Sequence, residues 1–244
     1  MERIVKKNTS ASITYCNVAS QSRGPVLEKS QDASGPWVPD KAEFTNYTND
    51  TFALGLQYRL AVAWNLGQPI LIEGETGIGK TAAVNKMAAD LGWEVHSLYC
   101  HSGTKPEHLL GQYVPNTKTS KPPYVFAEGP VTRGLRQEEG RTKVILLEDL
   151  NFQMKRRGDV QSVLVSVMDS LNRNSTFNLA EYVPDQGMIE VSKDKTKLVA
   201  LVCPPGGGYL NREPFDVKFV DHWMYQKLPS ELPFEARKER MLGL

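Results

Sequence analysis

The stretch GETGIGKT, residues 74–81, has the residue types and spacing of a phosphate-binding loop. It fits the pattern G-x-x-x-x-G-K-[ST], in which glycines let successive backbone amides point at phosphate oxygens. The Lys80 ammonium can reach the β and γ phosphates of a nucleotide, and the Thr81 hydroxyl can bind Mg²⁺. A chance match is the alternative. The predicted nucleotide-binding residues are Gly74, Glu75, Thr76, Gly77, Ile78, Gly79, Lys80, Thr81 and Ala82.

A second chemical feature is the pair of acids, Glu148 and Asp149, that ends the apolar run KVILL. A bound nucleotide needs Mg²⁺ held by carboxylate and water oxygens, and a further acid that orients the attacking water. We therefore expect Glu148 near the metal with Thr81, and Asp149 beside the water. Lys80, Glu148 and Asp149 are the predicted catalytic residues, and ATP and Mg²⁺ the predicted ligands. Without the phosphate loop, the two acids would be interpreted as solvated residues at a strand end.

These residues need a scaffold, and the apolar pattern predicts alternating strands and helices. Apolar residues spaced by four predict a helix from Phe52 to about Gly67. A second helix is predicted between the loop and Gly92, and a third in DVQSVLVSVMDSLNR with Asp159 as its N-cap. The predicted buried strands are PILIE, WEVHSLYC, KVILLE and KLVALV. This alternation predicts an α/β fold with a parallel sheet.

Two hairpins and an N-terminal segment complete the predicted organisation. The hairpins are predicted at 113–126 and in TFNLAEYVPDQGMIEV. Residues 1–50 are rich in Ser, Thr, Asn and Gly, which predicts a mostly irregular arm with one short strand at ASITYCNV. Residues 51–244 are predicted to form one nucleotide-binding α/β domain.

Composition narrows the class of protein and the environment. The formal net charge is +1, so no global field draws the chain to nucleic acid or to a membrane. No apolar run approaches the roughly 18 to 20 residues that span a bilayer. Three widely spaced cysteines suit a reducing compartment. We expect a cytoplasmic protein without membrane contact. An organellar location is the alternative, because residues 1–27 are slightly basic, and a nuclear one also fits.

Several motifs in order make the chain resemble the AAA+ ATPases, and within them the MoxR, midasin and dynein-related branch. The similarity extends over about residues 52–235. The segments that carry it are PILIEGETGIGKT, the run from Cys100 to Thr104 that leads to LLGQY, FAEGPVTRGLR, LLEDLN with the following DVQSVL, YVPDQGMIEV, and ALVCPPGG. Ordered landmarks of this kind are more specific than a phosphate loop alone.

The resemblance implies a P-loop NTPase core: a five-stranded parallel sheet flanked by helices, with inserted β-hairpins. It also implies a homo- or hetero-oligomeric ring that uses ATP hydrolysis to remodel a partner protein or complex. Hairpin 113–126 would point toward the ring's pore with Lys118 and Lys121 near its tip, although both suit solvated loop lysines equally well. The alternatives are a structural nucleotide-binding subunit without useful turnover and, less favoured, a small-molecule phosphotransferase.

The chain departs from the family pattern at residues that would affect hydrolysis. The acids are reversed, since the family has Asp before Glu, and the shorter Asp149 would lie about an ångström short of the water, a displacement that can cost about a hundredfold in rate. The sensor position, Asn in the family, falls on Cys203, whose thiol is a weak hydrogen-bonding group. The family's arginine finger, worth about 10³ to 10⁵ in rate, aligns with Asp221-His222-Trp223 or, more loosely, with Lys218.

The family's helical lid would begin near PFEARKERML, and the chain given ends at Leu244, so we expect the lid to be missing here. Together these departures predict slow hydrolysis, or hydrolysis that depends on another subunit.

Two further groups of residues have competing interpretations. His96, Cys100, His101 and His108 could suggest a metal site, but their spacing matches no standard zinc motif. Lys155-Arg156-Arg157 could contact nucleic acid or an acidic partner, while a solvated loop is the simpler interpretation. Nucleic-acid binding is therefore compatible with the sequence but not indicated by it.

Overall fold

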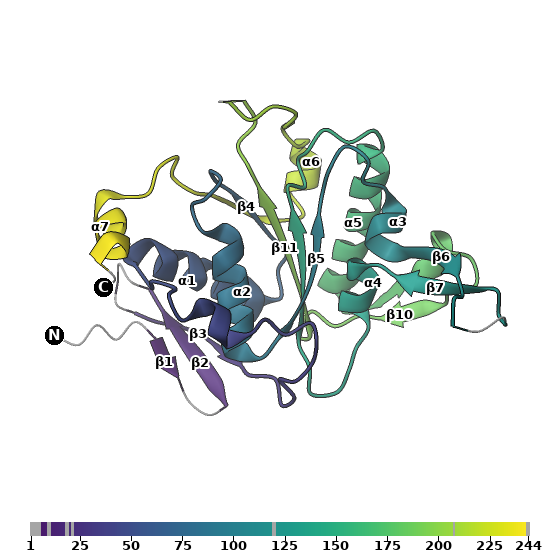
Figure 1. Cartoon of the computed structure of the whole chain (residues 1–244), viewed down its shortest axis with the longest axis horizontal. Coiled ribbons are helices and arrows are strands. Elements are labelled where there is room, and N and C mark those ends of the chain that lie inside the picture. Colours follow the sequence, from purple (N-terminus) through teal and green to yellow (C-terminus); the bar gives the residue numbers. More distant parts are fainter. Residues whose placement is uncertain are drawn as a thin grey trace.

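The computed structural model describes residues 6–8, 11–17, 20, 22–118, 121–206 and 208–242. At its centre is a five-stranded sheet in the order β12-β4-β11-β8-β5. Figure 1 labels β4, β11 and β5 of this sheet. All neighbouring strands are parallel. The strands are β4 (Ile70–Glu73), β5 (Glu94–Tyr99), β8 (Lys143–Glu148), β11 (Thr196–Val202) and β12 (Met224–Lys227). The predicted parallel α/β sheet is confirmed, and β12 is a strand that the apolar pattern does not reveal.

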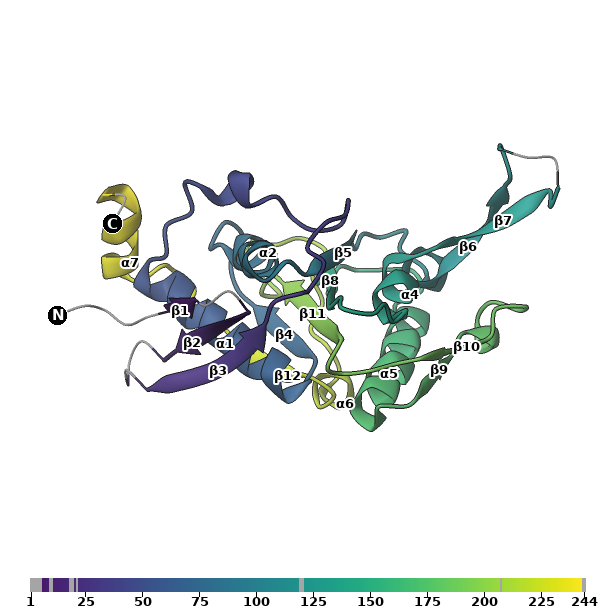
Figure 2. The same cartoon turned by 90° about the horizontal axis from the view of Figure 1, so that it is seen from below.

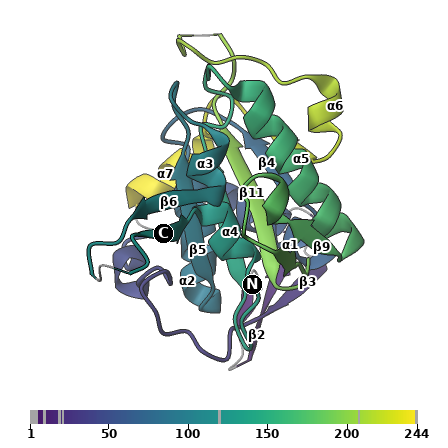
Figure 3. The ribbon, with the colours of Figure 1, turned by 90° about the vertical axis from the view of Figure 1, so that its right-hand side faces the viewer.

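Helices cover both faces of this sheet because its strands are apolar on both sides. On one face, Ile70, Leu146 and Val199 pack in a cluster with α1 (Thr51–Leu66) and α2 (Lys80–Leu91). Their neighbours Leu71 and Leu147 belong to the opposite cluster, with α4 (Pro130–Leu135) and α5 (Arg157–Arg173). Figure 3 shows α3 (Pro106–Leu110), α4 and α5 on this second side. The alternation follows from the two-residue period of a strand.

Helix ends explain where the long helices start and stop. The Asp50 side chain accepts hydrogen bonds from two backbone amides at the start of α1, and Gly67 ends this helix with φ 65°. Gly92 ends α2 in the same left-handed conformation, as predicted. The predicted N-cap of α5 is wrong: the helix starts at Arg157, so Asp159 lies within its first turn. There its carboxylate pairs with Arg156 at 2.6 Å instead of capping an amide.

Two predicted hairpins extend from the same end of the molecule (Figure 2). The first pairs β6 (Gly111–Pro115) with β7 (Tyr124–Glu128). The second pairs β9 (Thr176–Asn178) with β10 (Met188–Glu190), with the 3₁₀ turn η2 (Leu179–Glu181) between them. Tyr113 connects the hairpins, because its hydroxyl donates to the Pro184 carbonyl over 3.3 Å.

The N-terminal region contains more strands than the single one predicted within the mostly irregular arm of residues 1–50. It contains a three-stranded antiparallel sheet of β1 (Lys6–Asn8), β2 (Ser12–Cys16) and β3 (Arg23–Glu28), followed by the 3₁₀ turn η1 (Lys41–Phe44). Ile13, Tyr15 and Leu27 are buried in the same cluster as α1 and α2. Only β2 was expected, because β1 and β3 carry too few apolar residues to show alternation.

The C-terminal part returns the chain to the sheet and then to α1. The short helix α6 (Val217–Val220) precedes β12, and α7 (Phe234–Leu242) follows it. Figure 1 places α7 beside the start of α1. The contact is specific, because Glu239 accepts a hydrogen bond from the Thr51 amide over 2.6 Å.

Candidate nucleotide site

The phosphate-type loop connects the end of β4 to the start of α2. Gly77 and Gly79 have φ values of 79° and 103°, a backbone region that other residues rarely adopt. Gly79 precedes the helix without a side-chain cap, so the first amides of α2 keep their donors for a ligand. A helix N-terminus with free amides attracts negatively charged groups. The local structure thus has the chemistry that a phosphate requires.

Lys80 closes over the loop that it follows. Its ammonium donates to the carbonyl oxygens of Gly74 at 2.6 Å and Glu75 at 2.9 Å. Burial lowers the pKa of Lys80, and the nearby acidic groups, among them Asp149 and Glu148, oppose this effect. A buried ammonium that donates to neutral carbonyls would gain from charged phosphate oxygens in their place.

Thr81 and Glu148 are brought together by the sheet. Thr81 lies in the first turn of α2, and Glu148 is the last residue of β8. The Thr81 hydroxyl donates to Glu148 Oε2 over 2.6 Å. A hydroxyl oxygen and a carboxylate oxygen at this spacing are oxygen ligands of the kind that Mg²⁺ prefers. The two residues predicted for the metal therefore lie side by side.

Asp149 has an unusual backbone and strong side-chain contacts. Its φ of 54° is in the left-handed region, where Asp and Asn are tolerated better than other residues with side chains. Its Oδ2 accepts hydrogen bonds from the Tyr99 hydroxyl and from Arg212, both at 2.6 Å. The bond to Asp149 raises the pKa of Tyr99, because ionisation would remove the donated proton. Oδ1 faces the Cys203 thiol at 3.6 Å.

Cys203 lies between the acid and the phosphate-type loop, where the resemblance places the sensor. Its sulfur is 3.3 Å from the Thr76 hydroxyl, and its carbonyl accepts a hydrogen bond from Asn151 over 2.7 Å. The Thr76 amide donates to the Tyr209 hydroxyl over 2.9 Å. The structure therefore gathers the loop, both acids and the sensor position at the carboxyl edge of the sheet.

A cavity of about 370 Å³ adjoins the loop on the side of the C-terminal helix. Its lining residues are Glu75, Thr76, Gly77, Ile78, Ser230, Glu231, Leu232 and Arg237. Arg240 of α7 pairs with the Asp50 carboxylate and donates to the Ile78 carbonyl over 3.4 Å. The helix α7, at the segment PFEARKERML where the resemblance places the start of a lid, thus contributes to the walls of the site.

Sequence reasoning did not find Tyr99, Tyr209, Arg212 and Arg240. Tyr99 had a usable signal, because it ends β5 and pairs in register with Glu148. Arg212 and Tyr209 lie in a loop without periodicity, where spacing does not determine which residues face the site. Arg240 depends on how α7 docks on α1, which a local pattern does not encode.

The two other groups with competing interpretations, the His and Cys residues and the basic triplet, make local contacts within the protein. Among the described residues, no group of three or more His, Cys, Asp and Glu side chains could hold a metal ion. His96 instead contacts Glu94 at 3.1 Å, and burial raises the pKa of Cys100 to about 12. Of the basic triplet, Arg156 pairs with Asp159 and Arg157 with Glu213.

In the segment that aligns with the arginine finger, two of the residues also contact other parts of this chain. Trp223 is buried, and His222 lies 3.8 Å from the Asp169 carboxylate. Lys218, the looser alignment, is exposed on α6. Among the described residues, no helix has the length and apolar character to cross a membrane.

The sheet, the glycine loop and the acids define a P-loop nucleotide-binding protein of the α/β class. The family model of the AAA domain, dynein-related subfamily, matches residues 69–213, which is more than half of the chain. The chain belongs to this family, and its relatives place it with the AAA+ ATPases of MoxR and midasin type.

The relatives are similar over different parts of the chain. Midasin of Giardia intestinalis is 25% identical over 216 residues, which are 88% of this chain and 4% of that protein. Protein NorQ of Paracoccus denitrificans is 36% identical over 69 residues, 28% of this chain and 24% of its own. The chain therefore spans a small part of the length of these relatives. A crystal structure from Cytophaga hutchinsonii, assigned as an ATPase, has a TM-score of 0.51 at 19% identity. It covers 84% of this chain and 51% of its own, and it supports the fold alone.

Proposed function

We propose that the protein binds Mg·ATP at the loop of residues 74–82 and hydrolyses it slowly. The observation that carries this proposal is the hydrogen bond between Thr81 and Glu148 beside a glycine loop at a helix start. The donor set fits Mg²⁺, and the loop amides with Lys80 fit the phosphates. Bound there, Mg²⁺ would supply charge neutralisation on the phosphate oxygens.

The residues of the chain would divide the work of binding and proton transfer. The loop amides and the Lys80 ammonium would hold the β and γ phosphates in place of the carbonyls that Lys80 now contacts. Thr81 and Glu148 would hold the metal. Asp149 would orient water and accept its proton, and Cys203 and Thr76 would lie next to the terminal phosphate. The proposal does not require a covalent intermediate.

A second candidate function is a nucleotide-binding structural subunit without useful turnover. It is favoured by one observation: Asp149 Oδ2 is already engaged by both Tyr99 and Arg212. A carboxylate oxygen that already accepts two hydrogen bonds is less available to hold a water molecule. The same binding site serves both candidates, and only turnover separates them.

We also infer that the protein works in a homo- or hetero-oligomeric ring and remodels a partner protein or complex. Support comes from the family, and from two hairpins that extend together from one end of the domain. Neighbouring subunits could supply the arginine that neither Lys218 nor the 221–223 segment provides. A mass measurement with and without Mg·ATP tests assembly, and a strict monomer in both conditions would contradict the ring.

The test of the nucleotide function compares the wild-type protein with Lys80→Ala. Calorimetry should detect Mg·ATP binding to the wild type, and the substitution should weaken it strongly. A phosphate-release assay at saturating Mg·ATP should give turnover that Lys80→Ala abolishes. Binding without turnover favours the structural subunit, and turnover only with an added acceptor favours a phosphotransferase. Absence of binding would contradict both main candidates.

A further inference from the structure

The loop that follows β11 is attached to the segment that follows the two acids. Phe152 and Arg212 form an antiparallel bridge. The Gln153 amide donates to the Asn211 carbonyl over 2.8 Å, and the Glu213 amide to the Asn151 carbonyl over 3.0 Å. These backbone bonds on both sides of Arg212 fix where its side chain starts. The loop is therefore joined by backbone hydrogen bonds to the segment that directly follows the acids.

The Arg212 side chain is itself held in one orientation. Its guanidinium lies 4.4 Å from the centre of the Phe152 ring, a cation–π contact that restrains a long side chain. Arg212 and Asp149 are only 10% and 13% exposed. A nearly dry pair of this kind is screened little by solvent, so its geometry is well defined. Tyr99, the other donor, is 59% exposed and offers a weaker restraint.

The two oxygens of the Asp149 carboxylate have different hydrogen-bond partners. Oδ2 receives both strong donors, whereas Oδ1 faces the Cys203 thiol, a weak donor. The thiol in turn contacts Thr76 of the phosphate-type loop. Oδ1 is thus the oxygen on the side of the loop, and it keeps the capacity to accept a proton from water.

We propose that Arg212 is a positioning residue that aims Asp149 Oδ1 at the water beside the terminal phosphate. The inference rests on the proposed ATP hydrolysis. Its physical basis is that the left-handed backbone and the short side chain of Asp149 leave the carboxylate little reach of its own. An ion pair on Oδ2 fixes the rotation of the carboxylate and so compensates in part for the missing methylene. Arg212 acts through Asp149 and does not need to touch the nucleotide.

The test measures kcat and the Kd for Mg·ATP in Arg212→Met, Arg212→Lys, Asp149→Asn and the double variant Arg212→Met with Asp149→Asn. Arg212→Met should lower kcat on the order of a hundredfold, because a misplaced group costs about this much. Its Kd should stay within about threefold of the wild type, since the lost interaction is not made to substrate. Arg212→Lys, which keeps the charge, should recover part of the rate. In the Asp149→Asn background, Arg212→Met should cause no further loss.

Arg157→Met is the matched control. Arg157 anchors the same loop from its other end, pairing with Glu213 at 2.6 Å and lying 4.9 Å from the Phe215 ring, without contact to Asp149. It should leave kcat near the wild-type value. An equal loss of kcat in this control would mean that the rate depends on the structure of the loop and not on the orientation of the Asp149 carboxylate.

Other results overturn the inference directly. They are a wild-type or higher kcat in Arg212→Met and losses that add to those of Asp149→Asn. The proposed function fails separately, if Lys80→Ala retains the turnover or if the wild type does not bind Mg·ATP. A wild type that binds Mg·ATP without turnover overturns both the proposed hydrolysis and the positioning role. Turnover that depends on Lys80 but not on Arg212 would contradict the positioning role of Arg212 and leave the proposed ATP hydrolysis intact.

Discussion

Thr81 and Glu148 lie 67 residues apart in the sequence, and their side chains meet over 2.6 Å. The parallel sheet accounts for this meeting. β4 delivers the loop that starts α2, and β8 is separated from β4 only by β11. Because parallel strands end at the same edge, the two elements present their side chains to one point. The pair is the part of the site where fold and chemistry coincide most directly.

The first prediction concerns the metal dependence of nucleotide binding. Glu148→Gln should weaken the affinity for Mg·ATP by roughly 10- to 100-fold. The reason is that a neutral amide oxygen would replace a charged carboxylate oxygen, which either binds the metal directly or orients one of its ligands. Affinity for ATP in EDTA should change little. Calorimetry with and without Mg²⁺ checks this. Lys86→Met, which breaks a partly buried ion pair with Asp90 on the same helix, should bind like the wild type. An unchanged Mg²⁺ dependence in Glu148→Gln would remove this residue from the metal site.

The second prediction concerns the order of the acids. The family pattern suggests that Glu at position 149 would improve hydrolysis, but the contacts of Asp149 predict the opposite. An added methylene would move the carboxylate away from Arg212 and Tyr99. The left-handed backbone would also become less favourable, by up to about 1–2 kcal/mol. Asp149→Glu should therefore lower both kcat and the melting temperature.

Asp185→Glu provides the control for this substitution. Asp185 also has a positive φ, 71°, but lies in the exposed second hairpin, away from the loop. It should share the backbone cost and leave turnover unchanged. A faster Asp149→Glu enzyme would show that reach matters more than the existing contacts.

The scaffold of the site could be predicted because its signals are local. Apolar runs gave β4, β5, β8 and β11, and capping residues such as Gly67 and Gly92 gave the helix ends. The glycine pattern predicted the loop, and the position of Glu148 at the end of β8 predicted its contact with Thr81. Each of these signals depends on residues close together in the chain.

The surroundings of Asp149 could not be predicted in the same way. Arg212 is 63 residues from Asp149, and a loop with no repeating pattern carries it. Its contact depends on backbone bonds between two irregular segments, for which sequence spacing gives no rule. β12 was hidden for a related reason: it is an edge strand with partly exposed residues, so it lacks the apolar run of a central strand.

The third prediction concerns Asp50, which links α1 to α7. Its Oδ1 accepts the amides of Phe52 and Ala53, both at 2.9 Å, and Oδ2 pairs with Arg240. Asp50→Ala removes the cap and the ion pair. Asp50→Asn keeps a capping oxygen, because Asn caps about as well as Asp. We expect Asp50→Ala to lower the free energy of unfolding by about 1 kcal/mol more than Asp50→Asn does. Urea denaturation of both variants measures this, and equal losses would assign the effect to the pairing with Arg240 alone.

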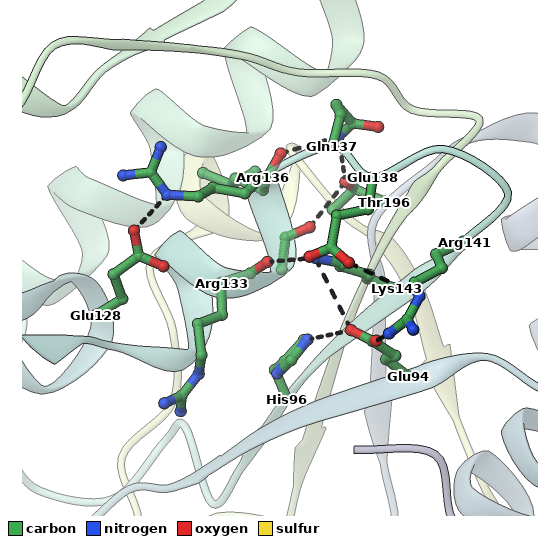
Figure 4. A network of polar contacts seen from close by, with 12 residues as sticks. Glu94, His96, Glu128, Arg133, Arg136, Gln137, Glu138, Arg141, Lys143 and Thr196 are labelled. Carbon is green, nitrogen blue, oxygen red and sulfur yellow. Dashed lines mark hydrogen bonds and ion pairs between the residues drawn. The ribbon is translucent and has the colours of Figure 1, made fainter. Parts of the chain in front are cut away.

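The last prediction concerns a buried polar network at the amino-terminal ends of β5 and β8 (Figure 4). The candidate nucleotide site lies at the opposite, carboxyl-terminal ends of the strands. Glu94 accepts a bond from Arg141 and lies 3.8 Å from the Lys143 ammonium and 3.1 Å from His96 Nε2. His96 is 2% exposed. Burial lowers the pKa of His96 below its usual 6.5, and the Lys143 and Arg133 charges add to this, while Glu94 opposes it. The folded protein therefore holds this imidazole neutral, and its contact with Glu94 is a hydrogen bond.

The direction of the pH effect follows from this lowered pKa. Below about pH 6.5 the unfolded chain takes up a proton on His96 that the folded state binds only at lower pH. The contribution of His96 to stability is thus present above pH 6.5 and is lost as the pH falls. His96→Gln keeps a donor for Glu94 but does not titrate. Between pH 7.5 and 5.0 the wild type should lose more stability than His96→Gln, by up to about 1.4 kcal/mol per pH unit below 6.5. Urea denaturation at several pH values measures both curves. If they run parallel, the imidazole of His96 is as easily protonated in the folded state as in the unfolded chain.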